Sequence, residues 1–406
     1  MRSISFAVVT LSALAARAPT FAQDPPKPAP PKQEQQEKQA QTGPPPLLVV
    51  SADEARTRVG KAVKWLVDNQ HPDGSWGSSA IDSVQFTNFS IETYYAFQLG
   101  AGSLAFMATL SVDETPERKA LLEKALTWLT TTRVPKRGND WDIDCSWPAL
   151  YGFQAMVAAA RDPRFQAEPW KSRVQARGME FYALLEHNQE PKGGWGYYEG
   201  PVMSQRPTWS TSFATACVVP SLVRAKELGW AIDPKVTARA ANYLEECHLP
   251  NGAYQYDCRP IPRNAGESID DVKGSLGRMQ VCNWALRRNG NKRITDDVIR
   301  ESLKDFFEQH KFLDAGRMRP IPHEAYYHVA AYFYMFGHCY AAQLIDELPE
   351  AERAALHQQL RAHLAKIQWA DGSSIDFPNL SCMQIAGTAF SILAFQAGLP
   401  GARMPL

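Results

Sequence analysis

The chain has 406 residues, of which 45% are hydrophobic, and its 43 basic side chains balance 43 acidic ones, so the formal net charge is zero. No long basic run is present, which argues against an electrostatic interaction with nucleic acid. From residue 50 onward no apolar stretch is long enough to cross a bilayer, so we expect no transmembrane segment in the mature chain.

The N-terminal region reads as a targeting segment followed by a linker. Residues 1–22, MRSISFAVVTLSALAARAPTFA, combine an early Arg2, an apolar stretch and a small-residue end. This pattern predicts a signal peptide, and therefore an exported protein, periplasmic or secreted. Residues 23–50 are rich in Pro, Gln and charge and poor in large apolar side chains, which predicts a disordered tether. A single folded domain is expected over residues 51–400.

This domain contains six similar segments, each about sixty residues long. A segment opens with a one-sided helix, as in KAVKWLVDNQHPDGSWG from Lys61, which stops at a Pro-Gly or Gly-Gly turn. A second stretch follows that is apolar around its whole circumference, as in residues 91–110, and this is typical of a buried helix. The six copies start at Lys61, Lys124, Gly178, Arg239, Leu303 and Leu360.

Six pairs of one outer and one inner helix predict an all-α fold. We expect an α6/α6 toroid, a double ring of six outer and six inner helices. The alternative is an open helical solenoid, which is also built from stacked helix pairs. Common solenoid repeats are shorter, about 33 to 47 residues, so the sixty-residue period favours closure.

The ends of the outer helices carry a recurring motif. Gln70 is followed by Trp76 and Gln189 by Trp195, and the sixth copy keeps Gln368. These segments resemble the Gln-Trp repeats of the terpene cyclase and protein prenyltransferase superfamily. The resemblance covers about residues 50–400 and implies an α6/α6 toroid in which the glutamine caps its helix and the tryptophan stacks on it, tying neighbouring outer helices together. Related toroids serve several chemistries, so the fold does not give the activity.

The strongest candidate site is DWDIDCSW, residues 140–147, at the start of an inner helix. Asp144-Cys145-Ser146 resembles the Asp-Cys-Thr protonating motif of sterol-type class II triterpene cyclases. Asp142 and Asp144 resemble the Asp-x-Asp start of the hopene-type motif, whose final Asp is missing here. The resemblance implies that Asp144 is a general acid, with Asp142 and Cys145 beside it, in a dry cavity that keeps the carboxyl group protonated. The alternative is that Asp144 or Ser146 caps the inner helix.

Aromatic and charged residues of the inner helices complete the candidate site. Ring faces could stabilise a carbocation, and the candidates are Tyr94, Tyr95, Tyr327, Tyr332, Phe333 and Tyr334. Lys273 and Arg278 in SIDDVKGSLGR could bind a diphosphate, although a solvated helix start explains their charge equally simply. Trp209 and Glu324, at the starts of two other inner helices, join Tyr95 and Tyr327 as substrate-binding candidates.

The cysteines and histidines give weaker indications. Asp144, Cys145 and His328 or His323 have the ligand types of the protein prenyltransferase zinc site, but Asp144 and Cys145 are adjacent rather than spaced. We therefore expect no cofactor, with zinc as the weaker alternative. In an exported protein Cys247 and Cys258 could form a disulfide; otherwise the seven cysteines are small buried hydrophobes.

Three functions remain open. The first is an exported cyclase-like or prenyltransferase-like toroid that acts on, or binds, an isoprenoid or other apolar chain. The second is a non-catalytic toroid that binds a lipid or a protein partner. The third is an exported polysaccharide hydrolase or lyase, which would pair Asp144 with Asp271 or Glu324 across a cleft. The sequence leaves open whether the protein is an enzyme.

Overall fold

The computed structural model describes residues 49–80, 89–136, 144–197, 207–258 and 267–405. Contacts divide the chain into Met1–Pro46 and Leu47–Leu406, and the fold described here is that of the second unit. The predicted signal peptide, the tether except for its last two residues, and Asp142 lie outside the described residues.

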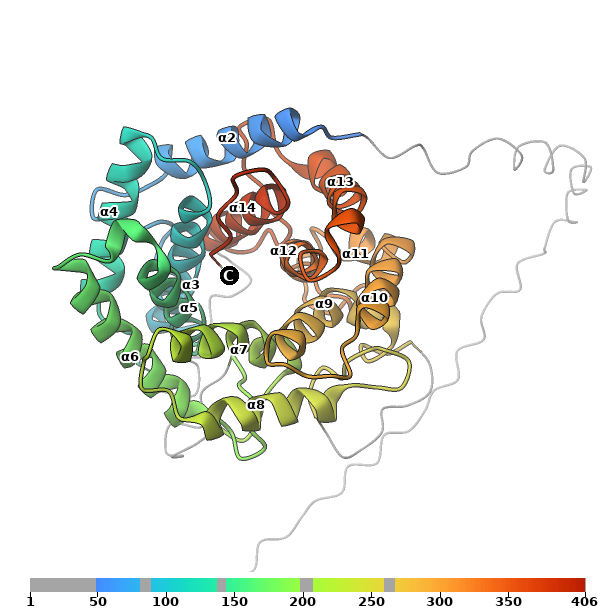
Figure 1. The fold of residues 1–406 in the computed structure, drawn as a ribbon. Coiled ribbons are helices and arrows are strands. Elements are labelled where there is room, and N and C mark those ends of the chain that lie inside the picture. The colour runs from blue at the N-terminus through green and yellow to red at the C-terminus, as the bar shows by residue number, and fades with distance from the viewer. Residues whose placement is uncertain (1–48, 81–88, 137–143, 198–206, 259–266, 406) are drawn as a thin grey trace, which may run out of the picture. The chain divides into compact units, whose positions relative to one another are not determined.

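Six buried helices surround a common centre (Figure 1). They are α3 (Ile91–Leu110), α5 (Trp147–Arg161), α7 (Ser212–Glu227), α9 (Val272–Arg288), α12 (Phe333–Ile345) and α14 (Ser381–Gln396). Each contacts the next along the chain, and α14 contacts α3, so the contacts run in a closed circle. Almost every side chain of α3 and α12 is buried, which explains why their sequences are apolar on all sides.

A second set of helices covers the outside of the first (Figure 1). They are α2 (Ala52–Asp68), α4 (Pro116–Thr131), α6 (Trp170–Asn188), α8 (Pro234–Cys247), α10 (Asp296–Glu308) and α13 (Glu350–Ile367). They pack in chain order on α14, α3, α5, α7, α9 and α12. The described ranges contain no strand, only two isolated bridges, and their fold is an all-α toroid. None of the helices in these ranges combines the length and the apolarity needed to cross a membrane.

Three glutamines at the ends of outer helices connect neighbouring outer helices. Each side-chain amide donates to a main-chain carbonyl of the following outer helix: Gln70 to Leu121 (3.0 Å), Gln189 to Val236 (2.9 Å) and Gln368 to Arg58 (3.0 Å). The bond from Gln368 joins residues 310 positions apart and ties α13 to α2. Trp76 and Trp195, in the loops after α2 and α6, donate from Nε1 to main-chain carbonyls of these helices, at Leu66 and Leu185.

A glycine follows each of these glutamines by four residues and permits the close approach. Gly74, Gly193 and Gly372 have φ of 95°, 109° and 93°, in the left-handed region. A Cβ on any of them would lie within 2.6 Å of a carbonyl oxygen of the next outer helix. Each Gln-x-x-x-Gly segment therefore forms a contact between two neighbouring outer helices, which we call a joint. The glutamine makes its hydrogen bonds, and the glycine leaves room for the close approach of the two backbones.

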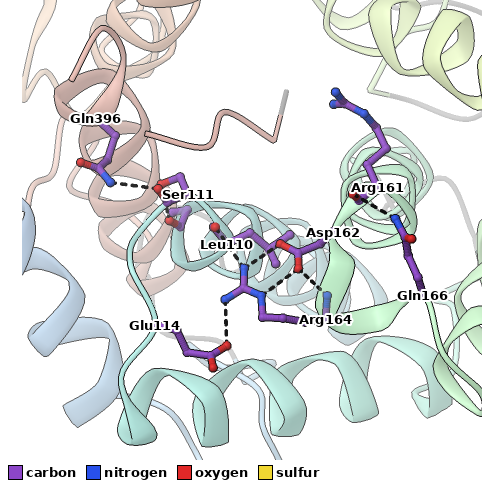
Figure 2. A network of polar contacts seen from close by, with 9 residues as sticks. Leu110, Ser111, Glu114, Arg161, Asp162, Arg164, Gln166 and Gln396 are labelled. Atoms are coloured by element: carbon purple, nitrogen blue, oxygen red, sulfur yellow. Dashed lines mark hydrogen bonds and ion pairs between the residues drawn. The ribbon is translucent and has the colours of Figure 1, made fainter. Parts of the chain in front are cut away.

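The C-terminal ends of three inner helices are held together by polar contacts (Figure 2). Arg164, in the short η1 (Pro163–Phe165) after α5, donates to both oxygens of Asp162 at 2.8 and 2.6 Å. The same guanidinium donates to the Leu110 carbonyl at the end of α3 (3.2 Å). Gln396, at the end of α14, donates to the Ser111 carbonyl at 2.9 Å. This network holds together the C-terminal ends of α3, α5 and α14.

Candidate active site

A cavity of about 310 Å³ lies among the N-terminal halves of the inner helices and the loops that precede them. Aromatic rings make up much of its wall: Phe89, Phe97, Trp147, Tyr151, Tyr197, Phe213, Tyr332, Phe333, Phe336, Phe377 and Phe390. Small residues of α3, Gly100 and Ala101, leave the space that these rings enclose. Its volume is at the lower end of the range of small-molecule pockets, about 300–1,000 Å³.

Asp144 is the one carboxylic acid in the lining that the structure describes. It lies in the loop before α5 with φ of 63°, a left-handed conformation that Asp tolerates better than most residues. Its Oδ1 accepts a hydrogen bond from the indole Nε1 of Trp147 at 3.0 Å. Ser146 precedes α5 but makes no side-chain capping bond, and the Asp144 carboxyl bonds an indole rather than a main-chain amide. The capping interpretation of this motif is therefore wrong.

The surroundings of Asp144 favour its neutral form. Burial raises the pKa of Asp144 to about 7, and the hydrogen bond from Trp147 opposes that rise only in part. Asp144 is partly exposed and lines the cavity. Burial also raises the pKa of Tyr332 and of Tyr256, and a negative charge on Asp144 would raise both further. Near neutral pH, a large fraction of Asp144 is therefore a carboxylic acid that can donate a proton.

Stacked rings surround the acid. Trp147 lies nearly parallel to Tyr151, with centroids 5.6 Å apart, and to Tyr197, with centroids 5.9 Å apart. Phe213 meets Phe333 edge to face at 5.1 Å and Phe336 at 5.8 Å. The negative faces of such rings attract cations, most strongly where water is excluded.

A second polar group in the lining is the pair of His323 and Tyr332. His323 Nδ1 lies 2.8 Å from the His328 carbonyl oxygen, which can only accept a hydrogen bond. We therefore assign the ring hydrogen to Nδ1, so that Nε2 accepts from the Tyr332 hydroxyl at 3.0 Å. The pair offers the cavity an imidazole and a phenol that are hydrogen-bonded to each other.

The other substrate-binding candidates from the sequence lie outside the cavity wall, whose described lining includes none of them: Tyr95, Trp209, Lys273, Arg278, Glu324 and Tyr327. Lys273 donates to the Tyr327 hydroxyl at 3.0 Å, and Trp209 donates to Asp257 at the same distance. Arg278 is fully buried and donates to main-chain carbonyls, including that of Gly274 at 2.9 Å. A guanidinium enclosed by carbonyls in this way is a structural element rather than a free anion site.

The structure does not bring together the zinc-ligand candidates from the sequence, and it does not pair Asp144 with Asp271 or Glu324. Cys145 is buried, His328 is exposed, and neither is part of the described lining that contains Asp144. Asp271 accepts from the Lys273 amide as the N-cap of α9, and Glu324 is exposed. Cys247 and Cys258 are free thiols in this structure and are hydrogen-bonded to each other.

Sequence reasoning missed several of the most central wall residues: Trp147, Tyr151, Tyr197, Phe213, Phe336 and Phe390. The signal for two of them was present, since Trp147 and Tyr151 are one helical turn apart, directly after the Asp144 motif.

No protein-family model matches the chain, and no curated protein matches its sequence. Its fold does resemble solved structures. An inactive variant of the alpha-1,6-mannanase GH76A of Salegentibacter sp., in complex with alpha-1,6-mannotetrose, has 11% identity and a TM-score of 0.52 over 84% of this chain and 98% of that one. A possible GH105 family member from Klebsiella pneumoniae has 11% identity and a TM-score of 0.51 over 86% and 94%. The type II terpene cyclase MstE from Scytonema has 13% identity and a TM-score of 0.46 over 84% and 98%. At such low identities the likeness to the first two structures shows the all-α toroid fold alone, and the chemistry has to be inferred from the site.

Proposed function

We propose that the protein binds an apolar, unsaturated chain of the isoprenoid type in its central cavity and that Asp144 protonates a carbon–carbon double bond of this ligand. One observation carries the proposal: in the part of the cavity wall that the structure describes, one carboxylic acid, Asp144, with its pKa raised to about 7, lies among aromatic rings. An apolar wall binds an apolar chain by removing its surface from water.

The chemistry follows from the groups in the wall. Transfer of the Asp144 proton breaks its O–H bond, and the π electron pair of the alkene forms the new C–H bond. The second alkene carbon becomes a carbocation and Asp144 becomes a carboxylate. The stacked faces of Trp147, Tyr151 and Tyr197 would stabilise the cation. To end the reaction, a C–H bond next to the cation breaks and its electron pair forms a new double bond. The proton goes to the Tyr332 oxygen while the Tyr332 hydrogen passes to His323 Nε2. His323 then releases a proton to water and Asp144 takes one from water, which restores both groups.

The same wall fits polysaccharide hydrolysis less well, although the mannanase shares the fold. Glycoside hydrolases use two carboxyl groups, about 5–9.5 Å apart, on either side of the bond that is cleaved. In the part of the cavity wall that the structure describes, Asp144 is the single carboxyl group, and neither Asp271 nor Glu324 joins it there. The described wall also offers a sugar few polar groups for its many hydroxyls, because most of the lining side chains are aromatic or aliphatic.

The test compares the wild-type protein with Asp144→Asn. Each is incubated with squalene, geranylgeraniol and geranylgeranyl diphosphate, and organic extracts are analysed by gas chromatography and mass spectrometry. Quenching of tryptophan fluorescence, to which Trp147 in the wall contributes, reports binding. We expect both proteins to bind an isoprenoid and only the wild-type protein to convert it.

Asp376→Asn is the matched control. Asp376 is also buried, and burial raises its pKa to about 7, but its Oδ2 accepts from the Met335 amide at 2.7 Å and it is not part of the described lining. This variant should keep the activity. Equal turnover by wild-type protein and Asp144→Asn would refute the acid role, and failure of all three compounds to bind would refute the ligand class.

A further inference from the structure

A cluster of two histidines and one aspartate lies outside the described cavity lining. We propose that His310, Asp314 and His363 bind a divalent first-row transition-metal ion, which connects α11 (Lys311–Gly316) to the outer helix α13. The inference is independent of the proposed function, because none of the three residues lines the described cavity.

The backbone brings the three side chains together. His310 and Asp314 are four residues apart at the start of α11, where the Asp314 amide donates to the His310 carbonyl at 3.0 Å, so both side chains lie on one helical face. His363 comes from α13, and its ring centroid lies 3.6 Å from that of His310. One ligand atom from each of the three residues lies within 4.8 Å of the other two.

The hydrogen bonds around His310 leave a place for a positive charge. His338, which is fully buried in α12, has its Nδ1 2.7 Å from the Tyr334 carbonyl, so Nδ1 carries a hydrogen. A neutral His338 then offers only a lone pair at Nε2, and His310 must donate from its own Nε2 across 3.0 Å. His310 Nδ1, on the other side of the ring, lies 3.0 Å from a carboxylate oxygen of Asp314, so these two atoms can bind the same cation.

A cation between His310 Nδ1 and the Asp314 oxygen would bind both atoms. A proton in this position would serve only these two residues. A metal ion would satisfy the same pair and also take the lone pair of the neighbouring His363 imidazole. The chain from His310 through His338 to the Tyr334 carbonyl is the kind of outer support that fixes the tautomer of a metal-binding histidine.

The ligand set indicates the class of ion. Two imidazoles and one carboxylate suit zinc, iron, cobalt and nickel rather than calcium or magnesium. Zinc bonds of about 2.0–2.2 Å to nitrogen and oxygen place neighbouring ligand atoms about 3.3 Å apart, so a small inward movement of the side chains completes the site. The Asp314 side chain is 55% exposed, which leaves a route for the ion and room for a water as a fourth ligand.

The test uses the full chain, stripped with a chelator and dialysed. Isothermal titration with zinc chloride should show one ion per chain with a dissociation constant in the micromolar range or tighter. Cobalt chloride should give the visible absorption bands of a tetrahedral or five-coordinate site. Zinc should raise the midpoint of thermal unfolding.

Asp314→Ala and His363→Ala should each weaken zinc binding at least tenfold, because each removes a ligand. Asp314 is exposed, so its variant is expected to keep the circular dichroism spectrum of the wild-type protein. His187→Ala, at an exposed histidine of α6, is the matched control and should bind zinc normally. The proposal is overturned if the wild-type protein binds no zinc at micromolar concentration, or if Asp314→Ala and His363→Ala bind it as tightly as the wild-type protein does.

Discussion

Replacing Asp144 with Asn should stabilise the folded protein at pH 8 and leave its stability nearly unchanged at pH 4. The carboxyl group has a pKa of about 7 in the folded protein, against 3.8 for the free side chain. Because the folded-state pKa is the higher one, the folded state holds the proton more tightly than the unfolded state does. The carboxylate therefore costs nothing below pH 4, costs progressively more between pH 4 and pH 7, and reaches its full cost above pH 7.

The size of the effect follows from the same two values. Each pKa unit corresponds to 1.36 kcal/mol, so the full cost is at most about 4 kcal/mol. Part of the Asp144 side chain faces the cavity, where water can reach it, so we expect a gain of about 1–3 kcal/mol in Asp144→Asn. The Asn side-chain oxygen can still accept from Trp147, which keeps the local geometry.

The assay is urea unfolding of both proteins at pH 4, 6 and 8, with the free energy of unfolding extrapolated to zero denaturant. The measurement at pH 4 is the internal control, because the carboxyl group is then largely protonated in the folded state and about half protonated in the unfolded state. Asp376 also has a raised pKa, but it is present in both proteins and cancels in the difference. A difference between the two proteins that stays constant across the three pH values would refute the assignment of a neutral, buried Asp144.

Three further predictions concern the joints and the acid. Gln368→Ala removes the donor to two carbonyls and should cost about 1–3 kcal/mol in urea unfolding. Gly372→Ala should cost more than Gly290→Ala, measured in the same way, because both glycines have positive φ but only a Cβ at Gly372 would meet backbone atoms. Equal losses would show that the close approach at Gly372 is unimportant. Trp147→Phe removes the hydrogen bond that lowers the pKa of Asp144, so the pH above which turnover falls should rise; an unchanged pH–rate profile would contradict this.

The outer helices were the part of the fold that the sequence predicted best. Their one-sided apolar pattern and their terminal glutamines are local signals, because both depend on residues within one or two turns of each other. Gln70 does bond to the next outer helix, but Gly74, which leaves room for that contact, was not singled out in the sequence. The hydrogen-bond partner of the tryptophan was less predictable, because Trp76 donates to a carbonyl of the helix that precedes it.

The inner helices show why the site was harder to predict. Helix α3 is buried on nearly all sides, so its apolar pattern does not reveal which face meets the cavity. Tyr94 and Tyr95 were chosen for their chemistry, whereas the wall uses Phe97 and the small Gly100 one turn further along. Asp144 was predicted as a site residue because Asp144-Cys145-Ser146 resembles a known motif that is visible in the sequence.

Long-range partners limit the other assignments. Arg278 looked like a free charge in the sequence, because the carbonyls that enclose it come partly from Tyr254, which is 24 residues away. His310 and Asp314 have visible helical spacing, but His363 is 53 residues beyond His310, and no local pattern connects the two. Sites assembled from several helices become predictable only when the order of packing is known.

The bond from Gln368 to Arg58 has a consequence for biosynthesis. Helix α2 packs mainly against α14, the last helix of the chain, and its link to α13 spans 310 residues. At a translation rate of about 5–20 residues per second, roughly 15 to 60 s pass between the synthesis of the two partners. During that interval the apolar stripe of α2 lacks the surface that later covers it. The N-terminal helix of the ring therefore reaches its final packing only after the last helices of the chain have been made.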